Sequence, residues 1–167
     1  MYKHIKIIAL KKLSEKKHYV NSVWEILNMS YKKVQGGLYF TSKKNLINST
    51  YIWKVILYKG EVIAVTIYKE KHGVKLVAMS VGNHFRELAV KILGDVIRRD
   101  LKQCWMELSE AAERFVMKLG GARYVLPNYI AEKVLEKHVQ LASDGVHYVR
   151  EIMGVKKEKI LLGTVRF

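Results

Sequence analysis

The 167-residue chain has little cysteine and proline, with one residue of each. Because Cys104 has no partner for an internal disulfide, we expect an intracellular compartment and an inert buried thiol. No apolar run approaches the ~18 residues that a membrane-spanning helix needs. The N-terminal segment also lacks the small-residue cleavage site of a secretory leader. These absences predict a mature cytoplasmic protein.

Acidic residues are scarce as well. The chain has 15 Asp and Glu against 30 Lys and Arg, a formal net charge of +15. An excess of this size favours a polyanionic partner such as DNA or tRNA. The alternative is a lysine-rich solubility surface, because the lysines are scattered along the chain. No helix pairs a basic face with Trp or Phe in the manner of an interfacial anchor, so no membrane partner is expected.

Several chemistry-bearing motifs are missing. The six histidines show no metal-ligand spacing, and with one cysteine no metal site is expected. Neither a P-loop nor the elbow of a serine hydrolase is present. Function must therefore be inferred from the order of the predicted elements and from the residues at their ends.

The first half of the chain predicts a strand, a helix and a meander. A strand is expected at 4–10, followed by a helix capped by Ser14 and ended by Gly36-Gly37, and by a short helix or ordered loop within 41–50. Runs rich in Val, Ile, Tyr and Trp predict antiparallel strands at 51–58, 61–70 and 74–81. Turn residues at 59–60 and 71–73 separate them.

The second half is organised around residues 103–121, where the hydrophobic period changes from strand to helix at Ser109. A helix at 84–100 precedes this stretch. Ser109 is expected to cap a helix that Gly120-Gly121 ends, with a return strand at 122–126. A helix at 129–142 and strands at 147–153 and 160–167, joined by a basic turn at 154–159, complete the prediction.

This order of elements resembles the GNAT N-acetyltransferase fold over roughly residues 4–126. The family pattern N-x-x-A-x-x-x-Y-x-K-x-G-F aligns with Ser109, Ala112, Val116, Lys118, Gly120 and Gly121. A tail D-G-x-H-Y-x-R at 144–150 resembles that of small GNAT-like proteins of phages and mobile elements, whose setting would be the host cytoplasm. The resemblance implies an α+β, three-layer fold with a mixed, mostly antiparallel sheet flanked by helices. Residues 1–167 would form one domain, with 129–167 as a helix plus two-strand extension.

The resemblance also implies an acetyl-CoA or other acyl-CoA donor, held where the fourth and fifth strands splay apart. Its pyrophosphate would lie on backbone amides at the start of the next helix, where free N–H groups and the helix dipole favour anions. The family pattern Q/R-x-x-G-x-G/A aligns here with Arg86, Ala89 and Lys91. The donor-binding candidates are Met79, Val81, His84, Arg86, Glu87 and Ala89.

Candidate catalytic residues lie in the fifth strand and the tail. Glu107 could take a proton from an incoming amine, with Trp105 and Ser109 on the same strand face. Many family members protonate the leaving thiolate with a tyrosine, whose position is Val116 here. By residue type, Tyr124, His147 and Tyr148 are the substitutes. Each also has an ordinary structural interpretation: Ser109 as a cap, Trp105 as a core aromatic.

Two functions remain open, and they belong to different classes. One is a GNAT-like N-acyltransferase acting on an amine, which a nucleic acid could carry. The other is a degenerate GNAT-fold protein of phage origin that binds nucleic acid or a host protein, as a monomer or homodimer. Side chains of Phe85 or Lys91 filling the donor site would favour the binder. A nucleic-acid acceptor predicts one basic surface made of Arg98, Arg99, Lys102, Arg150, Lys156 and Lys157.

Overall fold

The computed structural model describes residues 3–31, 40, 42–47, 50–71, 73–100, 104–109, 114–115, 117–118, 122–125, 147–152 and 156–166. Its helices are α1 (Leu13–Lys17), α2 (Val20–Tyr31), α3 (Lys43–Leu46) and α4 (Arg86–Asp100). Its strands are β1 (Ile5–Leu10), β2 (Tyr51–Tyr58), β3 (Glu61–Glu70), β4 (Val74–Val81), β5 (Cys104–Ser109), β6 (Ala122–Val125), β7 (His147–Ile152) and β8 (Lys156–Arg166). None of the described helices is long and apolar enough to cross a membrane.

The central meander confirms the predicted bounds. β1 pairs antiparallel with β2, β2 with β3 and β3 with β4. The β2–β3 turn places Lys59 at φ 50° and Gly60 at φ 81°. Two successive positive φ values are typical of a type I′ hairpin turn, whose twist matches that of the flanking strands. Glycine is needed at position 60 for this conformation rather than for space, because an added Cβ would meet nothing within 4 Å.

The predicted first helix is wrong at its start. The structure has two helices, α1 and α2, separated at residues 18–19, and Lys12 rather than Ser14 occupies the N-cap of α1. The Lys12 backbone N–H donates to Glu15 Oε1 (3.1 Å). A glutamate three residues into a helix satisfies the cap amide in this way, so the helix can begin before the serine.

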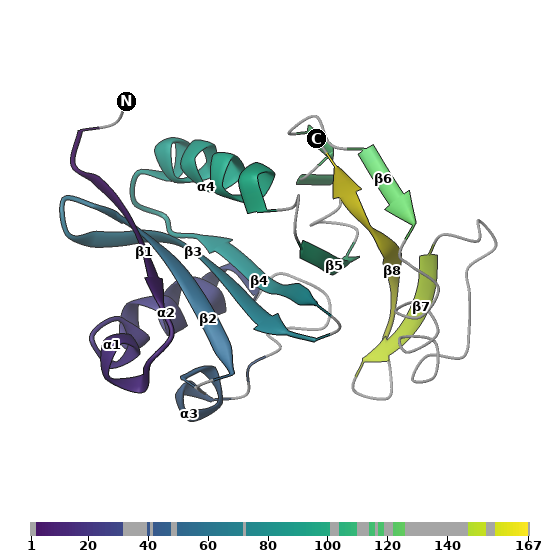
Figure 1. Ribbon diagram of the computed structural model, residues 1–167, viewed down its shortest axis with the longest axis horizontal. Coiled ribbons are helices and arrows are strands. Elements are labelled where there is room, and N and C mark those ends of the chain that lie inside the picture. Colours follow the sequence, from purple (N-terminus) through teal and green to yellow (C-terminus); the bar gives the residue numbers. More distant parts are fainter. Residues whose placement is uncertain are drawn as a thin grey trace.

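Helices cover both faces of the meander (Figure 1). On one face α2 packs against a cluster that includes Leu27, Trp53 and Val65, each fully buried. On the other face α4 packs against a second cluster that includes Ile63, Tyr68 and Ala89. This three-layer arrangement is the predicted α+β fold, and it fixes β4 between the two helices.

Beyond β4 the sheet continues in the order β4-β5-β8-β6, with β7 also paired to β8. β5 lies parallel to β4 and antiparallel to β8. The predicted basic turn at 154–159 is wrong in part, because 156–159 belong to β8, where they pair with 149–152 of β7. Ser109 is the last residue of β5, residues 114–115 and 117–118 are helical, and the predicted helix at 129–142 lies outside the described residues.

Candidate functional site

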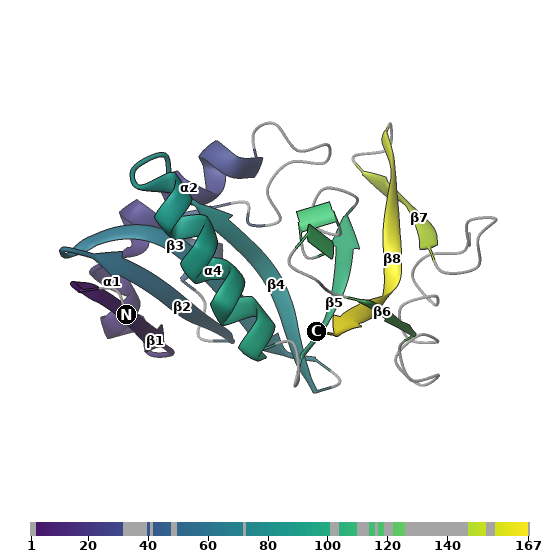
Figure 2. The same ribbon diagram turned by 90° about the horizontal axis from the view of Figure 1, so that it is seen from above.

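The two parallel strands β4 and β5 part shortly after they meet. They pair at three positions, Val74 with Cys104, Lys75 with Trp105 and Leu76 with Met106. β4 then continues to Val81 and β5 to Ser109, and these described residues do not pair with one another. Figure 2 shows the two strands diverging from this point. Within the described residues, one backbone edge of β4 is therefore left without a strand partner along residues 77–81.

A β-bulge in β4 coincides with the separation. Ile67 of β3 pairs with Ala78 and Tyr68 pairs with Leu76, so Val77 is an extra residue without a partner on β3. A bulge bends its strand and increases the local twist. Because Leu76 is also the last β4 residue paired with β5, the bulge explains why the strands part there. Glu107 is the next β5 residue beyond that last pair.

The end of β4 is fixed against α2. The Ser80 hydroxyl donates to the Ile26 carbonyl (3.1 Å) and hydrogen-bonds the Ser30 hydroxyl. The flanking residues Met79 and Val81 are half-buried and pack with the α4-side cluster. The two donor-binding candidates on β4 therefore lie on the face that α4 covers, while Ser80 anchors the strand from the opposite face.

The loop from β4 to α4 is held by contacts to β2 and β3. The Gly82 N–H donates to the Ile63 carbonyl (2.8 Å), and His84 Nδ1 lies 2.7 Å from Glu61 Oε1. Phe85 has φ 53°, which is unfavourable for a bulky side chain, and its ring meets the Tyr58 ring edge-on with centroids 4.7 Å apart. Phe85 thus lies over β2, away from the parting strands.

The N-terminus of α4 follows directly. Arg86 is its first residue and is exposed, as is Glu87, and the Ala89 N–H donates to the Phe85 carbonyl (2.8 Å). Ala89 is fully buried in the α4-side cluster, so its methyl group packs into the core and leaves the helix start uncrowded. Lys91 is exposed. Of the two side chains whose filling of the donor site would favour a binding protein, Phe85 instead packs on Tyr58 of β2.

The register across β5, β8 and β7 relates the catalytic candidates. Ser109 and Tyr148 both pair with Ile160, and His147 pairs with Leu161, the partner of Leu108. Directly paired residues share a sheet face and successive residues alternate. Tyr148 therefore falls on the face of Glu107 and Ser109, and His147 on the other. Tyr124 pairs with Thr164, further along β8.

The predicted basic surface divides into two groups. Arg98 forms an ion pair with Asp95, whereas Arg99 Nε lies 3.8 Å from Asp100 Oδ1, a carboxylate that the Lys54 ammonium also binds. Arg150 lies on β7 opposite Glu158, and Lys156 and Lys157 lie on β8. Lys102 lies outside the described residues, as does Val116. No group of three or more His, Cys, Asp or Glu in the described ranges could hold a metal ion.

The sequence alone did not predict one polar cluster that the structure contains. Lys54 Nζ contacts both carboxylate oxygens of Asp100 at 2.8 Å, and the Tyr68 hydroxyl donates to Oδ2 (2.7 Å). Burial raises the pKa of Tyr68 above its usual range, and the bond to Asp100 adds to that effect. Burial likewise raises the pKa of Cys104 to about 11. These residues come from β2, β3, α4 and β5, which are far apart in the sequence, so no sequence motif identifies them.

A second missed feature is a buried lysine. Lys16 of α1 is fully buried; its ammonium donates to the Tyr51 carbonyl and lies 5.4 Å from the centre of the Trp53 ring. Burial lowers the pKa of Lys16, which the neighbouring Glu15 partly offsets. It lies under β2 on the α2 side, whereas Met79 and Val81 pack on the α4 side, so it stays outside the candidate site.

No protein-family model matches the chain, and no curated protein matches it. Solved structures do match. The chain is similar to Ard1 from Thermoplasma volcanium, with TM-score 0.55 and 15% identity over 98% of this chain and 99% of that one. It is similar to the ribosomal-protein-S18-alanine N-acetyltransferase of Escherichia coli, with TM-score 0.53 and 15% identity over 97% and 92%. A probable GNAT-family acetyltransferase from Chromobacterium violaceum gives TM-score 0.56 and 8% identity over 96% and 87%. These likenesses, together with the parting of β4 and β5, show that the chain has a GNAT-like fold.

Proposed function

We propose that the protein is an N-acyltransferase that moves an acyl group from acyl-CoA to an amine. The observation that carries this proposal is the separation of β4 from β5 at the Val77 bulge, on the strand whose end leads through residues 82–85 into α4. An exposed strand edge followed by a helix start offers two kinds of backbone donor to one elongated ligand: strand amides for its amide groups and helix amides for its phosphates. The fold likeness to acetyltransferases supports the same assignment.

The donor would be held mainly by backbone groups. Residues 77–81 of β4 would pair with the amide-containing arm of acyl-CoA, as an added strand does. The pyrophosphate would lie on the first N–H groups of α4, where Arg86 adds a positive charge. Glu87, in the same turn, would repel the pyrophosphate. The positive charge of Arg86 would offset that repulsion, so donor binding should be sensitive to its loss.

Glu107 is the proposed general base. It follows the last β5 residue paired with β4, so its backbone lies where the strands part. Its carboxylate would accept a proton as the amine attacks the thioester carbonyl; the N–C bond forms, the C–S bond breaks, and the thiolate leaves. Base catalysis of this kind contributes about 10²–10⁴ in rate.

Tyr148 is the proposed acid for the leaving thiolate. It shares its β8 partner with Ser109 and lies on the sheet face of Glu107, about two strand spacings, or ~10 Å, from β5. His147 lies on the opposite face, which makes it the weaker candidate. In this scheme Ser109 and Trp105 line the face that the acceptor approaches.

The acceptor would be an amine on nucleic acid. The net charge of +15 supports a polyanionic substrate. The phosphate contacts would come from Arg150, Lys156 and Lys157 on β7 and β8, with Lys156 the member whose cross-strand partner, Ile152, is apolar; Glu158 and Glu151 lie opposite Arg150 and Lys157, as Asp95 lies beside Arg98 on α4. Binding to duplex DNA or tRNA should then weaken with salt, with a log–log slope of about −0.9 per phosphate contacted on duplex DNA.

The test combines calorimetry with acetyl-CoA and mass-spectrometric detection of acyl transfer to a mixture of tRNA, DNA and small amines. We expect Arg86→Ala to weaken donor binding, and Glu107→Gln to leave donor binding unchanged while lowering transfer. Lys44→Ala, at an exposed position on α3 outside every candidate site, is the control. Failure of the wild-type protein to bind the donor at about 1 mM, where even weak ligands of about −4 kcal/mol occupy half the sites, would refute the proposal.

A further inference from the structure

The edge strand β1 is unpaired on its outer side by any described strand. It begins the sheet order and pairs with β2 along its whole length, Ile5 to Leu10. Exposed strand edges are usually protected by charges, prolines or bulges, because they pair with other chains. β1 carries only one charged residue, Lys6, in the sequence IKIIAL. Among the described residues, no strand therefore competes with a segment of another chain for this outer edge.

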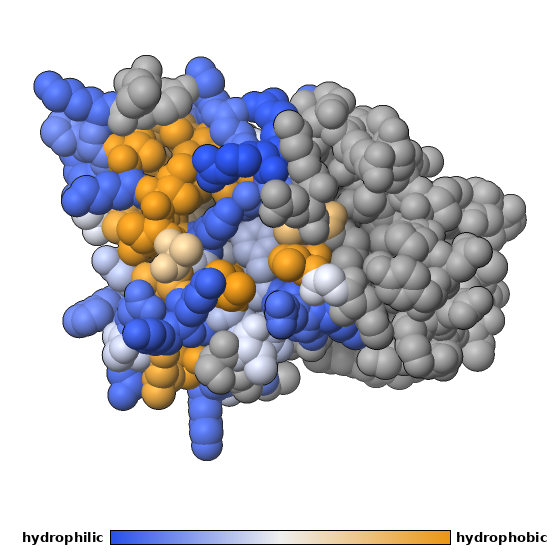
Figure 3. Space-filling model, viewed as in Figure 1, coloured by the Kyte–Doolittle hydropathy of each residue, from blue (hydrophilic) through white to orange (hydrophobic). Residues whose placement is uncertain are grey.

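An apolar strip follows this edge on the α4 side of the sheet. Ile5 packs partly against the α4-side cluster, and Ile7 and Ala9, two and four residues on, share its face. Ile7 is 41% exposed. Figure 3 shows the resulting hydrophobic patch over β1 among hydrophilic side chains. The strip is unusually apolar for an exposed strand face.

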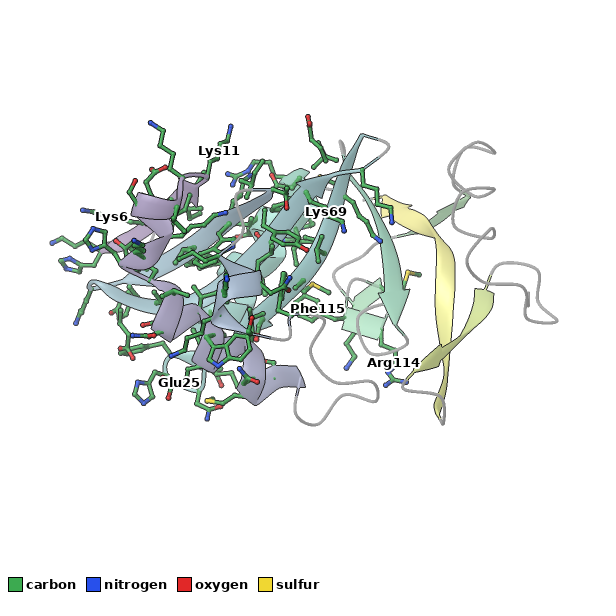
Figure 4. The ribbon with its side chains drawn as sticks, turned by 90° about the horizontal axis from the view of Figure 1, so that it is seen from below. Lys6, Lys11, Glu25, Lys69, Arg114 and Phe115 are labelled. Carbon is green, nitrogen blue, oxygen red and sulfur yellow. The ribbon has the colours of Figure 1, made fainter. Side chains whose placement is uncertain are left out.

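Exposed lysines lie on β1 and α1 and in the segments next to them. The exposed ones are Lys3, Lys6, Lys11, Lys12, Lys17 and Lys59. In the described part of the chain none of the six forms an ion pair. Glu15 is the one acidic residue between positions 3 and 19. Figure 4 shows Lys6 and Lys11 extending away from the body of the molecule.

We propose that β1 binds an extended acidic segment of another protein, which adds to the sheet as a strand. In β-augmentation the main chain supplies hydrogen bonds, and alternate side chains supply specificity. One set of partner side chains would cover Ile5, Ile7 and Ala9. The alternate set would lie on the opposite face with Lys6, where acidic groups are favoured. The expected partner segment therefore alternates apolar and acidic residues.

Charge decides between this partner and the other occupants of an open edge. A second copy of the chain would bring the same lysines against themselves, and like charges across an interface are unfavourable. A nucleic acid would match the lysines but would leave the apolar strip without a partner, since phosphate contacts need polar or charged donors. An acidic, strand-forming protein segment satisfies both features.

Selection from a displayed library of random peptides tests the proposal. We expect enriched sequences to alternate β-branched and acidic residues. Their synthetic versions should bind wild-type protein at least tenfold more tightly than Ile7→Lys and Lys6→Glu variants. Met29→Lys is the control, because Met29 is 36% exposed on α2. Denaturation curves would confirm that all variants fold.

The backbone contribution is tested separately. Methylation of every second amide of the peptide should abolish binding, because it removes the donors that pair with β1. Three results would overturn the proposal: no alternating sequence is enriched, Ile7→Lys binds as well as wild type, or the wild type self-associates in sedimentation and Ile7→Lys makes it monomeric. Acetyl-CoA binding should be unchanged in Ile7→Lys, so this proposal and the acyltransferase can fail independently.

Discussion

Replacing Asp100 should loosen the end of α4 and the start of β5. Asp100 is the last residue of α4, and only residues 101–103 separate it from Cys104. Its carboxylate binds the Lys54 ammonium of β2 and the Tyr68 hydroxyl of β3. The cluster therefore ties the helix end to two strands of the meander, next to the point where β4 and β5 begin to pair.

The expected magnitude follows from the geometry. Charges 2.8 Å apart attract by about 6 kcal/mol at an effective dielectric of about 20, before desolvation is subtracted. The side chains are 27% and 13% exposed, between a surface pair worth under about 1 kcal/mol and a buried pair whose disruption costs about 3–5 kcal/mol. We expect Asp100→Ala to destabilise the protein by about 2–3 kcal/mol, since it also leaves the buried Tyr68 hydroxyl without its acceptor.

A double-mutant cycle with Lys54→Met and Asp100→Leu isolates the pair. Urea denaturation of the four proteins should give a coupling energy of about 1–2 kcal/mol that changes little between low and high salt, because the pair is mostly shielded from solvent. A coupling below about 0.5 kcal/mol would refute the reasoning and make the contact an ordinary surface pair.

Three further predictions concern single residues. The rate of Cys104 alkylation in the native protein should rise with a midpoint near pH 11, against about 9.0 in the denatured protein. Because the unfolded thiol loses its proton at the lower pH, the free energy of unfolding should fall as pH rises through this interval. Phe85→Gly should lower the free energy of unfolding by about 1 kcal/mol less than Phe85→Ala does, as measured by urea denaturation. Both variants lose the Tyr58 contact, but only glycine relieves the positive φ. An equal loss of stability in the two variants would contradict this. Gly60→Ala should lower the free energy of unfolding by about 1 kcal/mol, because alanine disfavours the positive φ of this turn residue. Gly82→Ala should cost less, because the φ of Gly82 is not positive and an added Cβ would lie 3.5 Å from its nearest neighbour. The reverse order in thermal melts would contradict the turn assignment.

Local patterns predicted the meander well. The strands β2, β3 and β4 have the bounds expected from their Val, Ile and Tyr content and from the turn residues between them. The helix α4 starts two residues later than expected because Phe85, with its positive φ, ends the loop before it. Where the period of the apolar residues and the turn signals agree, the sequence alone was sufficient to predict the type and the bounds of the elements.

Long-range pairings were not predictable. The turn expected at 154–159 became strand because 156–159 pair with β7, which no local propensity reveals. The Val77 bulge depends on the register between β3 and β4, and the Lys54–Asp100 contact joins residues 46 positions apart. The GNAT resemblance pointed to the parting strands, whereas the bulge that separates them was visible only in the structure.

The most direct test of the donor site is a titration of backbone amide resonances with acetyl-CoA. We predict progressive shifts along residues 77–81 of β4 and at the first residues of α4, 86–88, with β1 unchanged. Arg86→Ala should shift the same amides only at higher donor concentration. Absence of shifts in these two segments at saturating donor, or shifts confined to other parts of the molecule, would contradict the assignment of this site to acyl-CoA.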